Sequence, residues 1–234
     1  MGESITQHLA RRGDRVAVFD IQGDRAEAVA KELRSESAQA IGCQVDVTDR
    51  AAVDSAMDRV RREFGPVEIL VTSAGLSVFE PFADITLESW NRLIAVNLTG
   101  TFHCVQAAIG DMVAARWGRI VTISSSSAQR GSPRMVHYAA SKGGVIAMTK
   151  ALAREYAPLG ITVNNVPPSG IETPMQHEQQ AEGNLPANEV MAQAIPLGRL
   201  GTGDDIAAAC AFLTSDEAGF ITGQVLGVNG GSYI

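Results

Sequence analysis

The residues best placed for proton chemistry are Tyr138 and Lys142, which stand four positions apart near the middle of the chain. The residues that follow, GGVIAMTKALAREYA, have helix-forming, amphipathic spacing, so both side chains should lie on one helix face. A phenol with an ordinary pKa of about 10 is a poor base near neutrality, but a nearby ammonium stabilises its phenolate and lowers that pKa. The spacing therefore predicts that Tyr138 exchanges a proton near pH 7.

Two polar residues upstream complete a recognisable set. The β-branched run RIVTISSSS predicts a buried strand that ends in hydroxyls, at the edge where open α/β sheets bind ligands. Ser125 lies thirteen residues before Tyr138, and Asn97 stands in VNLTG. Together they resemble the Asn-Ser-Tyr-Lys constellation of the classical short-chain dehydrogenase/reductase family. A lone Tyr-x-x-x-Lys is common by chance, whereas four ordered elements are specific, and the resemblance extends over essentially the whole chain.

The resemblance implies a fold and a reaction. The fold is a Rossmann-like doubly wound, mostly parallel sheet with helices on both faces. The reaction is NAD-dependent interconversion of a secondary alcohol and a ketone, with Tyr138 as acid/base and Ser125 bonded to the substrate oxygen. Lys142 would lower the pKa of Tyr138 and bind ribose hydroxyls, and Asn97 would hold a water that connects Lys142 to solvent. Alternatively, Asn97 simply bonds to neighbouring backbone.

The N-terminal sequence departs from the family pattern. MGESITQHLARRGD predicts a short helix with Ile5 and Leu9 on its apolar face, ended by Gly13, and RVAVF predicts a strand. In the family, a strand and a Thr-Gly-x-x-x-Gly-x-Gly turn precede that helix, and only Gly2 matches, at the last glycine. We therefore expect the first strand to be absent and the phosphate site to be weakened, through a missing N-terminal segment or a true loss.

The end of the RVAVFD strand predicts which nicotinamide cofactor is used. Asp20 stands where a carboxylate accepts hydrogen bonds from both ribose hydroxyls of NAD and repels a 2′-phosphate. Since no Arg or Lys follows before Arg25, NAD is expected rather than NADP. Alternatively, Asp20 caps the next helix, although Asp24 is the better cap. The resemblance assigns these further residues to the cofactor: Ile21, Asp46, Val47, Ser73, Ala74, Gly75, Tyr138, Lys142, Pro168, Ser169, Ile171 and Thr173.

Two of these cofactor turns differ from the family. The usual Asn-Asn-Ala-Gly is Thr-Ser-Ala-Gly at 72–75, which loses two amides and predicts a looser turn. In PPSGIETPM, Ser169 stands where the family has glycine, and Gly170 comes one place later. A side chain at Ser169 therefore occupies a place that is normally open. By resemblance, the backbone of Ile171 and the hydroxyl of Thr173 contact the carboxamide and a phosphate.

Composition favours one domain, 1–234, acting on a small molecule. The chain is 45% hydrophobic, and its net charge of −7 without a basic cluster offers little attraction to nucleic acid or anionic membrane. We find no signal segment and no apolar run near the roughly 20 residues that span a bilayer, so we expect a cytoplasmic protein. The three cysteines and four histidines lack ligand spacing, so no metal is expected.

The remaining expectations concern the C-terminal third and rival functions. The polar segment 176–195 predicts a substrate lid at about 175–196, and ITGQVLGVNGG predicts a last strand. His137 should point about 100° away from Tyr138, toward a pocket or rim. The resemblance implies a homo-oligomer, a tetramer or a dimer.

The rival functions are a non-catalytic member of the fold with impaired cofactor binding, and dehydratase or epimerase chemistry on nucleotide-linked sugars, whose enzymes are usually longer.

Overall fold

Five parallel strands form the centre of the structure, a computed structural model that describes residues 1–234. One ladder pairs β1 (Val16–Asp20) with β2 (Ala40–Gln44). The other has the order β3 (Ile69–Thr72), β4 (Gly118–Ile123) and β5 (Ile161–Val166). Because all pairs are parallel, the carboxyl ends of neighbouring strands share one edge, where open sheets bind ligands. The predicted Rossmann-like α/β fold is confirmed.

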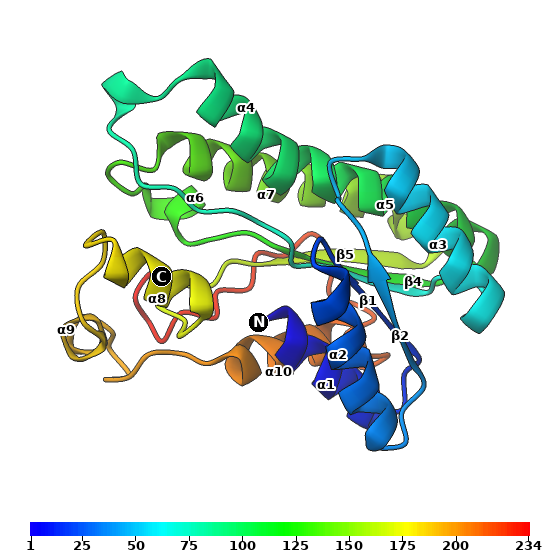
Figure 1. Cartoon of the computed structure of the whole chain (residues 1–234). Coiled ribbons are helices and arrows are strands. Elements are labelled where there is room, and N and C mark those ends of the chain that lie inside the picture. The colour runs from blue at the N-terminus through cyan, green and yellow to red at the C-terminus, as the bar shows by residue number, and fades with distance from the viewer.

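Helices cover both faces of the strands (Figure 1). One layer holds α3 (Arg50–Phe64), α4 (Leu87–Ile94), α5 (Gly100–Ala115) and α7 (Val136–Tyr156). The other holds α1 (Gly2–Arg12), α2 (Gly23–Ser35) and α10 (Gly203–Leu213). Strand β4 serves both layers because successive side chains alternate: Ile120 joins the core beneath α3 and α5, and Val121 the core beneath α1 and α10. The shorter helices are η1 (Phe82–Asp84), η2 (Ala95–Thr99), α6 (Ser127–Arg130), η3 (Ala157–Leu159), α8 (Pro174–Ala181) and α9 (Asn188–Gln193).

The N-terminal helix ends where the sequence predicts. Helix α1 ends at Gly13, which adopts a positive φ of 99°, and Ile5 and Leu9 are buried together with Ile206 and Leu213 of α10. The chain is thus ordered into the core from its first turn. The chain opens with this helix, and no strand precedes it within residues 1–234. The β1–β2 and β3–β4–β5 ladders share no strand pair.

One expectation about membrane-spanning character was wrong. The continuous helical run Leu87–Ala115 is long and apolar enough to cross a membrane by length and composition. The core helix of a soluble protein passes the same test. Cys104, Val105 and Met112 of this run lie in the core beside Ile120 of β4. Packing against the sheet therefore accounts for part of its apolar composition.

The C-terminal segment differs from the predicted last strand. Only isolated bridges form, between Asn165 and Val225 and between Pro168 and Val228. Gly223 and Gly230 have φ values of 71° and 60°, so the backbone leaves the extended conformation at both ends of the segment. The sequence pattern of alternating apolar residues was therefore insufficient to make a ladder.

Candidate active site

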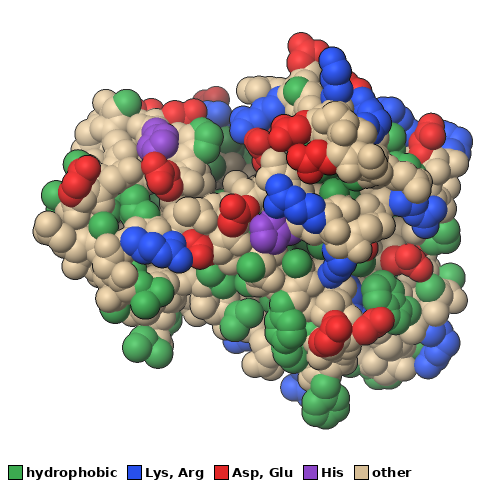
Figure 2. All heavy atoms as spheres, turned by 90° about the horizontal axis from the view of Figure 1, so that it is seen from below, with side chains coloured by type: hydrophobic (Ala, Val, Ile, Leu, Met, Phe, Trp, Pro, Cys, Tyr) green, Lys and Arg blue, Asp and Glu red, His purple; other side chains and the backbone are tan.

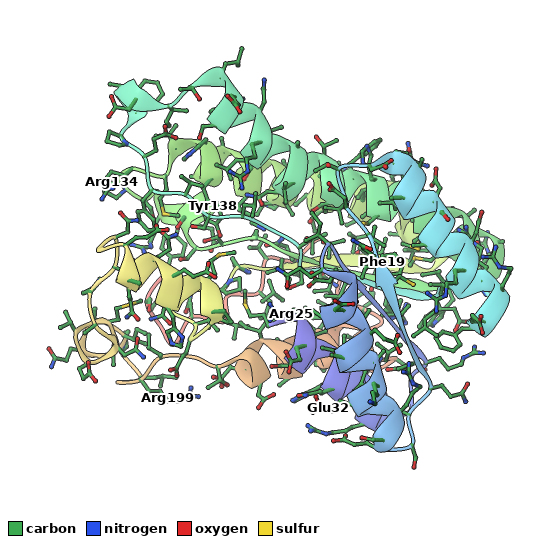
Figure 3. The ribbon with its side chains drawn as sticks, in the orientation of Figure 1. Phe19, Arg25, Glu32, Arg134, Tyr138 and Arg199 are labelled. Carbon is green, nitrogen blue, oxygen red and sulfur yellow. The ribbon has the colours of Figure 1, made fainter.

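Helix α7 carries Tyr138 and Lys142 on one face, as their spacing predicts. Tyr138 is half-buried and lies at the end of α7 nearest to α8 in Figure 3. Lys142 is 5% exposed, and its Nζ donates to the carbonyl of Ile123, the last residue of β4, at 3.0 Å. Ser125 follows that strand, is buried, and hydrogen-bonds to Tyr138. Strand β4 and helix α7 therefore bring three of the four predicted catalytic residues together.

The electrostatics of this cluster differ from the expectation. Burial raises the pKa of Tyr138 above its ordinary value, and the hydrogen bond with Ser125 opposes that rise only in part. Burial also lowers the pKa of Lys142 to about 8, since no carboxylate faces its ammonium. The prediction that Lys142 holds the pKa of Tyr138 below 10 is therefore wrong for the free protein. The physical reason is that desolvation of the phenol outweighs the favourable contacts.

Asn97 sits in an irregular helical turn beside this cluster. It belongs to η2, a π-helical turn between α4 and α5, and its side chain is completely buried. Its Oδ1 accepts from the Leu76 N–H at 2.8 Å, and its Nδ2 donates to the Leu76 carbonyl at 3.0 Å and to the Ser141 hydroxyl at 2.9 Å. The Asn97 side chain thus bonds to backbone, which was the alternative to a water-holding role. It also joins the loop after β3 to α7.

The loop after β3 leaves room for a ligand next to Lys142. A Cβ on Gly75 would lie 3.1 Å from both Lys142 Nζ and Asn97 Oδ1, so any other residue would crowd these two groups. The neighbouring hydroxyl of Thr72 is buried without a partner. Ser73 lies beside the start of α1, because a Cβ on Gly2 would be 3.6 Å from its Oγ. The exposed Ala74 completes the turn. An open cradle and an unsatisfied polar group both fit a dinucleotide cofactor.

The carboxyl ends of β1 and β2 place the next group of expected cofactor residues. Asp20 uses Oδ1 to accept from the Gln22 N–H at 2.8 Å, so it shapes the turn before α2, whereas its other oxygen is free. Ile21 is 61% exposed. Asp46 Oδ1 accepts from both the N–H and the hydroxyl of Thr48, which fixes the turn that carries Val47.

The turn after β5 holds the last group of expected cofactor residues. Pro168 accepts a hydrogen bond from the Ser126 N–H at 3.0 Å, which ties this turn to the one carrying Ser125. Gly170, with φ of 61°, takes the left-handed position, and Ser169 is accommodated beside it. The hydroxyl of Thr173 accepts from the Gln176 N–H at 3.2 Å and caps α8.

A cavity of about 530 Å³ adjoins this turn. Ser169 and Ile171 line one side of it, and the C-terminal segment Leu226–Gly231 lines another. Neither Tyr138 nor Ser125 reaches it. The cavity is thus next to the expected nicotinamide turn but is separate from the proton-transfer residues.

Several supporting residues escaped the sequence reasoning. His103 on α5 bonds through Nδ1 to the Val47 carbonyl at 3.0 Å, and Ser141 receives the Asn97 amide. Glu80 lies 3.5 Å from His137. His103 and Val47 are 56 positions apart in the chain, and Glu80 and His137 are also distant, so no local pattern signals these contacts.

Comparisons with known proteins agree with this geometry. A family model described as enoyl-(acyl carrier protein) reductase matches residues 1–233, and its start at residue 1 gives no support to the expected missing strand. The 3-oxoacyl-[acyl-carrier-protein] reductase FabG of Escherichia coli is 40% identical over 100% of this chain and 93% of its own length. The D-threitol dehydrogenase of Mycolicibacterium smegmatis is 37% identical over 100% and 89%.

A solved structure is similar over nearly the whole chain. A gluconate 5-dehydrogenase from Burkholderia cenocepacia, in complex with NADP and tartrate, has a TM-score of 0.90 and 31% identity, covering 98% of this chain and 89% of its own. These three proteins are named as a reductase and two dehydrogenases, which does not favour a non-catalytic role. The chain belongs to the short-chain dehydrogenase/reductase family and is an oxidoreductase that acts on CH–OH groups with a nicotinamide cofactor.

Proposed function

We propose that this protein interconverts a secondary alcohol and a ketone, with Tyr138 as the acid/base. The observation that supports this most is the placement of Tyr138, Lys142 and Ser125 around the carboxyl end of β4. When bound, the cofactor supplies or accepts the hydride. Because burial raises the pKa of Tyr138 above its ordinary value, the neutral phenol is favoured and can donate a proton to a ketone oxygen. The free protein is therefore better prepared for ketone reduction.

The other catalytic residues position the substrate and the cofactor and supply protons to Tyr138. Ser125 bonds to the substrate oxygen and sets its angle to Tyr138. Lys142, whose pKa is lowered to about 8, binds ribose hydroxyls of the cofactor and returns a proton to Tyr138 through them. The Asn97 side chain holds the loop after β3 against α7. Its backbone carbonyl, which already accepts from the Thr101 hydroxyl at 2.8 Å, lies beside the route by which protons reach Lys142. A direct test is reduction of a ketone panel, followed by loss of cofactor absorbance, with Tyr138→Phe as the inactive control.

We further propose NAD as the preferred cofactor. The free carboxylate oxygen of Asp20 at the end of β1 suits a ribose diol and disfavours a 2′-phosphate. The residues proposed to hold the remaining parts are Gly2, Ile21, Asp46, Val47, Ser73, Ala74, Gly75, Pro168, Ser169, Ile171 and Thr173. The gluconate 5-dehydrogenase neighbour was solved with NADP, so the preference needs its own test.

The test of cofactor preference compares two aspartates. Asp20→Ser should raise the NADP/NAD ratio of kcat/KM by roughly tenfold or more, equivalent to about 1.4 kcal/mol. Asp24→Ser, which removes an exposed carboxylate from the first turn of α2, should leave the ratio unchanged. A wild-type protein that prefers NADP, or an unchanged ratio in Asp20→Ser, would contradict the proposal.

The substrate is proposed to be a small ketone or alcohol with apolar substituents, enclosed by the loop 76–80 and by a lid at about 175–196. The panel should therefore include a 3-oxoacyl thioester, a cyclic ketone and a short polyol such as threitol. Turnover of the polyol alone would contradict the apolar preference.

Figure 2 shows acidic and basic side chains interspersed on one face, which fits a cytoplasmic protein without a nucleic-acid or membrane partner. A homotetramer or dimer is proposed, which light scattering can test.

A further inference from the structure

His137, directly before Tyr138, is buried in an unusual way. Its side chain is 0% exposed, yet neither ring nitrogen has a hydrogen-bond partner. Buried polar atoms are nearly always paired, because an unpaired one loses its bond to water without replacement. The reaction described above does not use this residue. Its burial therefore calls for another explanation.

The acidic group that faces His137 belongs to the loop after β3. Glu80 Oε2 lies 3.5 Å from His137 Nε2, and the same oxygen accepts from the Ser89 hydroxyl of α4 at 2.6 Å. The backbone N–H of Glu80 donates to the Arg134 carbonyl at 2.7 Å. Glu80 thus joins three segments, namely its own loop, α4 and the turn that leads into α7.

The other end of this loop is also fixed. The Asn97 side chain bonds to both backbone groups of Leu76. Between these two attachments the chain runs through Ser77, Val78 and Phe79. The guanidinium of Arg134 lies 5.9 Å from the centre of the Phe79 ring, and Figure 3 shows Arg134 and Tyr138 at the same end of α7. Residues 76–80, here named the wall loop, are therefore held beside the catalytic tyrosine.

We propose that His137 is a positioning residue that holds the wall loop against α7 through Glu80. Its neutral imidazole directs Nε2–H toward the Glu80 carboxylate, which Ser89 orients from the other side. The wall loop then keeps a constant distance from Tyr138, and the bound ketone is confined between them. This inference rests on the proposed function, because it assigns the wall loop to the substrate. It predicts that His137 acts on substrate KM more than on kcat.

The experiment compares two replacements of His137 with a matched control. His137→Leu removes the donor, whereas His137→Gln retains an N–H near the position of Nε2. His8→Leu removes the imidazole of another histidine-carboxylate pair, His8–Asp204 at 3.2 Å, which links α1 and α10 away from Tyr138. The measurements are ketone KM, kcat, cofactor affinity, and hydrogen exchange of the peptide covering residues 76–86 in the protein without substrate.

His137→Leu should raise the ketone KM roughly three- to tenfold, with kcat changed by less than about twofold and cofactor affinity unchanged. It should also speed exchange in residues 76–86. His137→Gln should restore both readouts to near wild type, and His8→Leu should alter neither. If His137→Leu does not fold, Glu80→Gln provides the second variant and should shift both readouts in the same direction.

Equal effects of His137→Gln and His137→Leu, or an unchanged KM together with unchanged exchange, would overturn the inference. Exchange does not depend on turnover, which separates the two hypotheses. If no ketone is reduced but His137→Leu still loosens residues 76–86, the proposed function fails while the structural role of His137 stands. If ketones are reduced normally and the loop does not respond, the inference alone fails.

Discussion

Replacing Lys142 by methionine should stabilise the protein near neutral pH while abolishing turnover. The ammonium is 5% exposed, and burial lowers its pKa from 10.5 to about 8. At about 1.4 kcal/mol per pKa unit, keeping this group charged at pH 7 lowers the free energy of unfolding by roughly 3 kcal/mol. Methionine has a similar volume without the charge, so Lys142→Met should gain about 1 to 3 kcal/mol after losing the bond to the Ile123 carbonyl.

The pH dependence of this gain identifies its cause. Because the pKa is lower in the native state than in the unfolded chain, the unfolded chain binds more protons between pH 8 and pH 10.5, and wild-type stability rises with pH there. From pH 7 to pH 9 the rise should be about 1.4 kcal/mol, and the advantage of Lys142→Met should shrink by that amount.

Urea unfolding followed by circular dichroism at pH 7 and pH 9 measures both effects. Lys150→Met, which changes an exposed lysine of the same helix, is the matched control and should show no such pH dependence. A Lys142→Met advantage that stays constant between the two pH values would refute the desolvation argument. A variant that is destabilised at both would show that the bond to Ile123 outweighs burial of the charge.

Three further predictions follow from individual contacts. Tyr138→Phe should abolish reduction while changing cofactor affinity by less than about threefold, because only the phenolic hydroxyl is lost; equal loss of binding in calorimetry would argue against an acid/base role. Gly42→Ala should lower the free energy of unfolding by about 1 to 3 kcal/mol, because its Cβ would lie 2.6 Å from backbone atoms of α2, whereas Gly110→Ala meets nothing and should not destabilise. Burial lowers the pKa of His137 more than Glu80 raises it, so the native state resists protonation. Stability should therefore fall as the pH drops below about 6.5, and less so in His137→Gln.

The local patterns of the sequence carried the family resemblance that predicted the fold class, and they predicted which elements hold Tyr138, Lys142 and Ser125. The spacing of Tyr138 and Lys142 acts through the helix repeat, and the hydroxyl of Ser125 follows a β-branched run that could only be a buried strand. The end of α1 was also predictable, because Gly13 supplies the left-handed residue that ends it. These features depend on neighbours within a few residues, so they can be predicted without the tertiary structure.

Tertiary packing decided the properties that depend on distant neighbours. The sequence suggested a lowered pKa for Tyr138, but desolvation is a sum over all surrounding atoms, and in the structure it exceeds the bond from Ser125. The expected last strand is reduced to two bridges, since Gly223 and Gly230 bend a segment whose pattern looks extended. Glu80 meets His137 only because α7 packs beside the loop after β3. Charge state and long-range pairing thus follow from the three-dimensional arrangement, because burial and contact have no fixed period along the chain.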